Sequence, residues 1–206
     1  LIKIIKTERI QDGVERLIFS AGEAAIKSVQ DLESKVLRVS ELLEVQIDKV
    51  ESTLQKAVAE WKELRRDKER LTNRLAMFMA EKYMSKAETV GILKIVSAIT
   101  SEEEADVNLH IKVANKVVQM DSCSVAVLIS VGEKVQIVAM VGDEAQKLGI
   151  DAKEITNLAA SEVGGGGSGK SDFAQGGGTK VENASKALEK AKMVIQKKLK
   201  GEWYAS

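Results

Sequence analysis

The residues that could carry chemistry gather between Gly164 and Lys180. Eight of the fifteen residues from Gly164 to Gly178 are glycine. Because glycine has no Cβ, consecutive backbone N–H groups in such a segment can line an anion or a nucleotide, as phosphate-binding loops do. Lys170 and Lys180 flank the segment. A flexible linker is the alternative, but Phe173 in the middle disfavours it. We therefore predict a surface that a ligand approaches closely.

The letters from Gly164 to Ser171 also satisfy the pattern G-x-x-x-x-G-K-S of nucleotide-hydrolysing loops. That pattern carries its chemistry only between a strand and a helix. The preceding EITNLAASEV is typical of a helix, and Ser171 continues into DFAQGGG instead of starting one. We therefore expect no nucleotide hydrolysis at this segment.

Other chemically active side chains are few. His110 is the only histidine, and it lies on a predicted helix without a second histidine or a nearby cysteine. A metal or acid–base site is therefore not expected, and His110 is predicted to be structural. Cys123, the only cysteine, lies in the apolar run CSVAVLISV, which favours a buried structural thiol and a reducing compartment. Glu102 to Glu104 favour the charged first turn of a helix.

Charge and composition restrict the partners. The 206 residues include 31 Lys and Arg against 31 Asp and Glu, so attraction to nucleic acid must come from a local patch. The segment from Gly164 to the C-terminus has eight Lys and four acids, a net charge of +4. A second basic stripe, which could contact phosphate, recurs every four residues on one predicted helix, although the acidic residues between its members favour a solvated face. This stripe consists of Lys62, Arg66, Arg70 and Arg74.

Targeting features are missing from the sequence. It has no signal peptide and no apolar run near ~18 residues, so we predict a cytoplasmic chain. It opens at Leu1 directly into an apolar segment, which leads us to expect a fragment of a longer protein.

Two long helices are predicted before the globular part. The opening residues favour strands with a turn at Asp12-Gly13. Residues 23–86 contain no Gly or Pro and are rich in helix-forming types. A break is expected near Glu44 to Ile47, with Asp48 opening a capping box. The apolar residues of both helices form a seam with coiled-coil spacing, so a second copy of the chain or an upstream domain should cover it. The seam residues are Val29, Leu32, Val36, Val39, Leu43, Val50, Leu54, Val58, Trp61 and Leu64.

The rest of the chain predicts a small α/β domain. We expect a buried strand over Thr89 to Thr100, a helix that starts at Thr100 or Ser101, and a β-hairpin around Gly132. A short helix should end at Gly149, and Asp151 should cap the next one. The fold class is thus α+β: a long antiparallel two-helix, coiled-coil-like arm, then a small α/β domain with a mixed sheet of three or more strands.

The glycine-rich segment GGGGSGKSDFAQGGG resembles the signature of the C-terminal globular domain of alanyl-tRNA synthetases. A related domain accompanies DHH-family phosphoesterases. Upstream, KTERIQDGVERLIFSAGEAA resembles the end of the alanyl-tRNA synthetase editing domain. The resemblance implies three parts: residues 1–21 as the tail of the editing domain, 22–86 as a helical dimerisation and linker subdomain, and 87–206 as a tRNA-binding subdomain.

The resemblance implies a non-catalytic module that dimerises, holds the outer corner of alanine tRNA, and links aminoacylation with editing. No cofactor is expected in this chain, because ATP and zinc would belong to absent domains of an alanine-tRNA ligase. A DHH-type domain and a purely structural coiled-coil dimeriser are the alternatives. Phe173 could stack on a base or anchor the loop in the core, and anchoring is favoured. The tRNA-binding residues predicted from the family signature and from its flanking lysines are Gly164, Gly165, Gly166, Gly167, Lys170, Asp172, Phe173, Gln175, Gly176, Gly177, Gly178 and Lys180.

Overall fold

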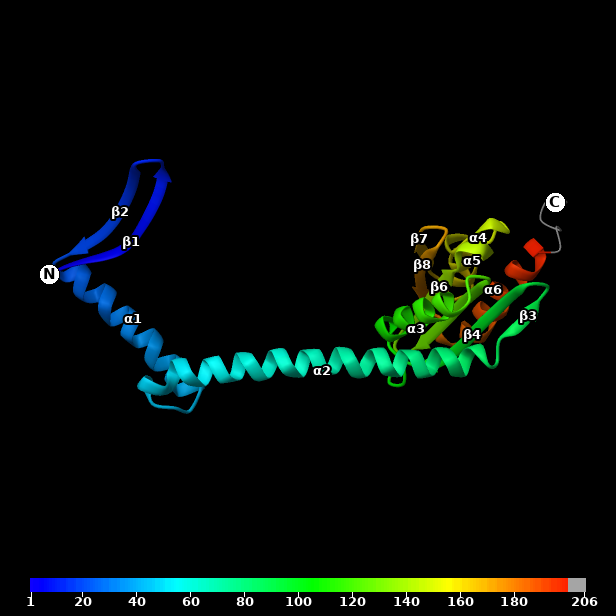
Figure 1. Cartoon of the computed structure of the whole chain (residues 1–206), viewed down its shortest axis with the longest axis horizontal. Helices are drawn as coiled ribbons and strands as arrows, with labels where there is room; N and C mark the ends of the chain where they lie inside the picture. Colours follow the sequence, from blue (N-terminus) through cyan, green and yellow to red (C-terminus); the bar gives the residue numbers. More distant parts are fainter. Residues whose placement is uncertain (200–206) are drawn as a thin grey trace. The chain divides into compact units, whose positions relative to one another are not determined.

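The structure is a computed structural model, and it describes residues 1–199. These residues form two compact units, one comprising Leu1–Asp67 and the other beginning at Lys68. Figure 1 labels the helices and strands of both units. The fold is α+β, with a long helix followed by a mixed sheet of six strands.

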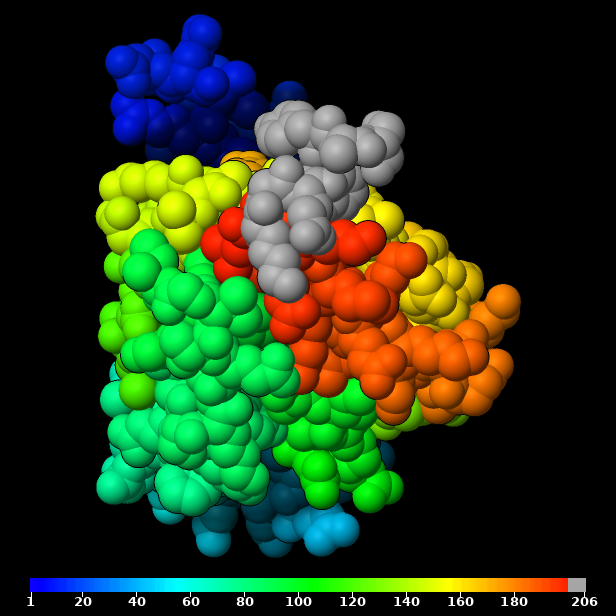
Figure 2. Space-filling model, turned by 90° about the vertical axis from the view of Figure 1, so that its right-hand side faces the viewer, coloured from blue at the N-terminus to red at the C-terminus, as the bar shows by residue number. Residues whose placement is uncertain are grey.

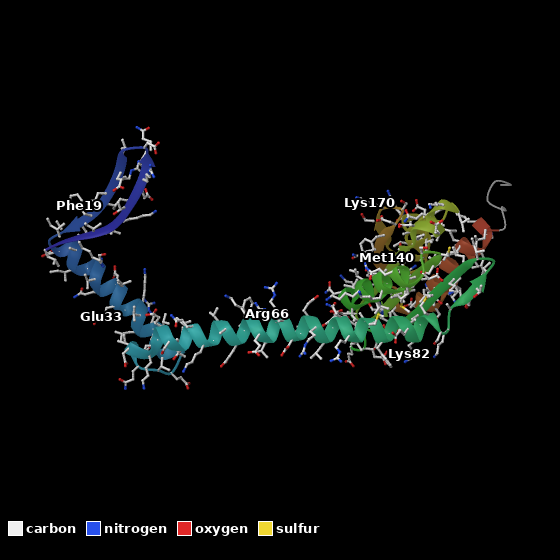
Figure 3. All side chains as sticks on the ribbon, in the orientation of Figure 1. Phe19, Glu33, Arg66, Lys82, Met140 and Lys170 are labelled. Carbon is white, nitrogen blue, oxygen red and sulfur yellow. The ribbon has the colours of Figure 1, made fainter. Side chains whose placement is uncertain are left out.

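The first unit opens with a β-hairpin. Strands β1 (Ile2–Gln11) and β2 (Val14–Ala21) pair antiparallel. The turn between them uses Gly13 at a φ of 79°, a conformation that glycine adopts without strain. The turn predicted at Asp12-Gly13 is therefore confirmed. Both faces of the hairpin carry exposed apolar side chains, and Phe19, labelled in Figure 3, is 57% exposed.

Two helices follow the hairpin. Helix α1 (Glu23–Leu42) ends at a turn in which Glu44 has a φ of 53°, and a 3-10 turn, η1 (Ile47–Lys49), leads into α2 (Val50–Met84). The predicted break is therefore confirmed, but the capping box is misplaced. Asp48 lies inside the 3-10 turn, and Gln46 occupies the N-cap position of that turn without a side-chain hydrogen bond.

Residues 22–86, all described by the structure, do not show the expected antiparallel coiled-coil arm within one chain. In Figure 1, α1 and the first turns of α2 diverge from the Glu44 turn. Their seam residues stay largely exposed, for example Trp61 at 58% and Leu64 at 68%. Near the turn, the two helices instead border a shallow, mainly apolar groove. Its lining residues include Val36, Ile47, Val50, Leu54 and Val58.

The second unit is built on a twisted six-stranded sheet in the order β3-β4-β5-β6-β8-β7. Strands β4 and β5 are parallel and are joined by a helical crossover, whereas the other neighbours are antiparallel. The elements are β3 (Glu88–Val90), β4 (Leu93–Ser101), α3 (Val107–Met120), β5 (Ser124–Val131), β6 (Val135–Val141), α4 (Asp143–Lys147), α5 (Ala152–Glu162), β7 (Gly166–Gly169), β8 (Phe173–Gly178), η2 (Val181–Asn183) and α6 (Ala184–Leu199).

Helices cover both faces of this sheet. One face, which includes Ile129 and Ile137, packs on α5 and α6. The opposite face, which includes Leu128 and Val138, packs on α3 and on Ala76 and other residues near the end of α2. Figure 2 shows α6, in orange and red, on the flank of this unit. Because successive side chains of β5 and β6 point to opposite faces of the sheet, these strands contribute to two separate hydrophobic cores.

Two predicted boundaries in this unit are wrong. The single strand expected over Thr89 to Thr100 is divided into β3 and β4 by a turn at Gly91, whose φ is 62°. The next helix does not begin at Thr100 or Ser101. It begins after Asp106, whose side chain accepts a hydrogen bond from the Leu109 N–H at 2.8 Å and thereby caps α3.

Other local predictions are confirmed. The hairpin of β5 and β6 turns at Gly132, and Gly149, with a φ of 82°, follows the short helix α4. Asp151 caps α5 by accepting a hydrogen bond from the Glu154 N–H at 3.0 Å. Cys123 is different from expectation, because it precedes β5 and is half-buried instead of buried.

His110 is fully buried on α3. Its Nε2 lies 3.0 Å from Thr100 Oγ1 on β4, and Nδ1 has no hydrogen-bond partner among residues 1–199. Burial lowers the pKa of His110 from 6.5 to about 4, and the Asp106 carboxylate opposes this shift only in part. The structural role predicted for this side chain is consistent with its place in the second core.

The buried histidine should make stability depend on pH. In the unfolded chain His110 takes up a proton near pH 6.5, whereas in the folded chain it stays neutral down to about pH 4. The free energy of unfolding therefore has its full value above pH 6.5 and decreases as the pH falls from 6.5 to about 4. The full shift corresponds to about 3 kcal/mol. We expect urea unfolding followed by circular dichroism to show a smaller loss of stability over this interval for His110→Gln than for wild type. Parallel pH curves for the two proteins would contradict this assignment.

Candidate functional site

The glycine-rich segment is a β-hairpin at the edge of the six-stranded sheet. Gly164, with a φ of 71°, turns the chain from α5 into β7. Strand β8 then lies between β7 and β6. At the tip, the N–H of Lys170 donates to the carbonyl of Phe173 at 2.7 Å. The segment that the sequence suggested as a loop is therefore ordered by strand pairing on both sides of β8, which compensates part of the entropy lost by its glycines.

Helix α5 lies directly on one face of this hairpin. An added Cβ on Gly167 would lie 2.8 Å from Thr156 Cγ2, and one on Gly176 would lie 2.7 Å from the same methyl group. These two glycines are cross-strand partners, so the Thr156 methyl packs against the backbone of both strands at once. A larger residue at either position would push α5 away from the sheet. Close packing of the helix thus accounts for these glycines.

Several backbone amides of the segment donate to groups inside the chain. Gly164 and Gly165 donate to carbonyls at the end of α5, at 3.2 and 3.0 Å. Gly167 donates outward from the sheet edge to the Asn157 side chain at 3.1 Å. The free row of N–H groups that would cradle an anion is therefore not formed by these residues. The segment also lies between α5 and β8, which is not the strand-to-helix setting of a nucleotide-hydrolysing loop.

The opposite face of the hairpin, toward α3, is uncovered. Two rows of cross-strand neighbours show at which strand the cover of this face by α3 ends. In the first row, Leu128 and Val138 are buried, whereas Gln175 and Ser168 are exposed. In the second, Ser130 is buried and Gly166 is exposed. Helix α3 thus shields β5 and β6 but leaves β8 and β7 open on this side.

Lysines stand at both ends of the hairpin. Lys170 is exposed at the tip, where Figure 3 labels it, and Asp172 is exposed beside it. Lys180, also exposed, lays its aliphatic stem over Gly164, so that Cε is 3.2 Å from where a Cβ would be. Phe173 is half-buried against the α3-side core. Of the two roles considered for Phe173, the structure supports anchoring.

The second basic stripe lies on another element. Lys62, Arg66, Arg70 and Arg74 are all exposed on α2, and Figure 3 labels Arg66. Arg70 also interacts with another group of the chain. These four residues keep the four-residue spacing that the sequence predicted, on a continuous helix.

Two residues that hold the site in place were not anticipated. Thr156 and Asn157 lie next to each other on α5, one buried beneath the hairpin and the other capping its edge. The sequence marks α5 as a helix but does not indicate that its next neighbour would be a bare glycine backbone. The sequence carries no local signal for this contact, because it depends on how α5 lies on the two strands that follow it.

The described part of the chain offers few other sites. Among residues 1–199, no group of three or more His, Cys, Asp or Glu side chains could hold a metal ion. In the same residues, no helix is both long and apolar enough to cross a membrane.

Comparison with known proteins identifies the family of the chain. Residues 90–197 match the DHHA1 domain. The alanine–tRNA ligase of Methanococcoides burtonii is 40% identical over 199 residues, which cover 96% of this chain and 21% of the relative. That of Pyrococcus furiosus is 37% identical over 191 residues, covering 93% of this chain and 20% of the relative. The chain therefore spans about a fifth of the length of these curated relatives.

Among solved structures, the C-Ala domain of Aquifex aeolicus alanyl-tRNA synthetase matches 53% of this chain and 97% of its own, with 25% identity and a TM-score of 0.49. The resemblance to alanyl-tRNA synthetases is confirmed by the sequence relatives. The chain belongs to the DHHA1 domain family, and almost all of it is similar to one stretch of the alanine–tRNA ligases.

Proposed function

We propose that this chain is a non-catalytic tRNA-binding and dimerisation module of an alanine–tRNA ligase. In this proposal it holds the outer corner of alanine tRNA and so links aminoacylation with the editing of mischarged tRNA. The observation that carries the proposal is the similarity to alanine–tRNA ligases over 93–96% of the chain. This role requires no cofactor, because in it the chain only binds tRNA and a second copy of itself.

The glycine hairpin supports RNA binding by its shape and charge. Its α3-side face is open, and Lys170 and Lys180 lie at its two ends. Lysine side chains attract phosphates, while a face without bulky side chains admits a base or a ribose close to the backbone. This arrangement suits recognition of RNA shape, with modest discrimination between tRNAs.

A DHH-type phosphoesterase domain is the competing function. In that case the glycine hairpin would border a catalytic cleft contributed by an acidic, histidine-rich domain. Alanine–tRNA ligases match 93–96% of this chain, far more than the DHHA1 domain alone, which favours the synthetase module. A purely structural dimeriser remains the other alternative, and the tRNA experiment separates it from the proposal.

The first test is binding of alanine tRNA. Wild type should bind in a fluorescence-anisotropy titration, with an affinity that falls as salt rises. Replacing both Lys170 and Lys180 with alanine should lower the affinity and reduce the slope of log K against log salt by about 2, roughly one per lost phosphate contact. Lys147→Ala, on α4 and paired with Glu144, is the matched control and should change neither. Absence of binding by wild type at low salt would leave only the structural dimeriser.

The exposed seam supports the dimerisation part of the proposal. Leu54 and Val58 are 42% and 46% exposed, and both line the apolar groove between α1 and α2. A helix is stabilised mainly by burying its apolar face, so these residues favour a partner surface. A second copy of the chain supplies an equal seam, and closed twofold pairing would bury both.

The second test is the oligomeric state. Wild type should sediment at twice the monomer mass at tens of micromolar protein. The double variant Leu54→Glu with Val58→Glu should sediment as a monomer, because paired carboxylates would have to be buried in the interface. Lys56→Glu, exposed on α2 but outside the groove lining, should leave the dimer intact. A wild type that remains monomeric throughout would refute dimerisation through this seam.

A further inference from the structure

Gly166 is a glycine that the fold does not require. Of the glycines among residues 1–199, the others either have a positive φ or would place a Cβ within 4 Å of another part of the chain. Gly166 has neither property, because an added Cβ there would meet nothing within 4 Å. Glycine in a strand weakens it, since the unfolded chain gains more freedom and no side chain packs. Its presence at an exposed strand position is therefore explained by something outside the chain.

The direction that Gly166 faces is fixed by the sheet. Its neighbour Gly167 packs against Thr156 on α5, so alternation along β7 turns Gly166 toward the α3 side. The cross-strand partner of Gly166 is Gly177, which together with it forms a floor of bare backbone. The next pair on this face is Ser168 with Gln175, and both side chains are exposed.

The chemistry of this face is neutral and hydrogen-bonding. The Ser168 hydroxyl and the Gln175 carboxamide can each donate and accept. Large apolar side chains of the kind that anchor protein partners are not contributed by β7, and Phe173 on β8 is turned into the core. Lys170 stands at the hairpin tip, and Lys180 lies over Gly164 at the opposite end, near the floor. A flat floor beside amide and hydroxyl groups fits a planar base or a ribose, and the lysines at the two ends of the hairpin can bind phosphates on either side of it.

We infer that RNA binds on the α3-side face of the β7–β8 hairpin, with a base or ribose resting on the Gly166–Gly177 floor and hydrogen-bonded by Ser168 or Gln175. The α5 side and the outer edge take no part, because Thr156 fills the first and Asn157 caps the second. This inference rests on the proposed tRNA-binding function and adds which face of the hairpin is used and by which part of the nucleotide.

The test is Gly166→Ala. A methyl group there should leave the urea unfolding midpoint unchanged or raised, because it meets no other atom of the chain and restricts the unfolded state. The same methyl group should lift the nucleotide off the floor and weaken tRNA binding about tenfold, within the range that base stacking contacts contribute. The salt slope should stay at the wild-type value, because no phosphate contact is lost.

Gly167→Ala is the matched control on the other face. Its Cβ would collide with Thr156 and Asn157, so its unfolding midpoint should fall. Gln175→Ala tests the hydrogen-bonding side chain and should weaken binding severalfold with an unchanged salt slope. If wild type binds tRNA while both Gly166→Ala and Gln175→Ala bind equally well, the face assignment is overturned. If wild type itself does not bind, the proposed function fails first, and the two failures are thereby distinguished.

Discussion

The contact between α5 and the bare backbone of β7 and β8 determines most of what the second unit can do. Thr156 sits against Gly167 and Gly176 at a separation that leaves no room for a Cβ on either. Because side-chain volume is absent on the strands, the helix approaches close enough for Asn157 to reach the outward N–H of Gly167 at 3.1 Å. One contact thus orders a glycine-rich sequence, covers one of its faces and satisfies its open edge, which would otherwise be available for pairing with another strand.

The same contact makes the hairpin one-sided. Helix α5 extends its cover from β6 to β7, whereas α3 on the opposite face stops at β6, so exposure rises abruptly from Val138 to Gln175 along one cross-strand row. A sheet edge covered on one face only is a common place for binding, because its backbone is rigid yet accessible. The hairpin is held in place by its packing against α5. Without that packing, its glycine-rich sequence would be flexible.

The sequence predicted the elements whose signals are local. Asp12-Gly13, Gly132 and the Asp151 cap each specify a turn or a helix start within four residues, and all three are found. The sequence-based prediction was wrong where contacts outside the local segment determine the boundary of an element. Gly91 divides an apparently continuous β-branched run, and Asp106 displaced two earlier polar residues as the cap of α3. The glycine segment was predicted as a loop because strand propensity scores glycine poorly, and only the α5 contact reveals why glycine is the residue that fits. The helical arm failed for a related reason: heptad spacing specifies a seam but not which surface covers it.

If the chain binds RNA as proposed, its net charge of zero means that affinity comes from local contacts and not from long-range attraction. Some lysines are paired with carboxylates, as in the pairs of Lys190 with Glu162 and Lys192 with Glu88 on α6. Affinity must then come from a close fit at a small number of places, and a side-chain-free strand face offers a closer approach than any lysine-covered surface. In the proposed role, weak local contacts suffice when the same RNA is also bound by another domain, because the linked contact then forms at a high effective concentration.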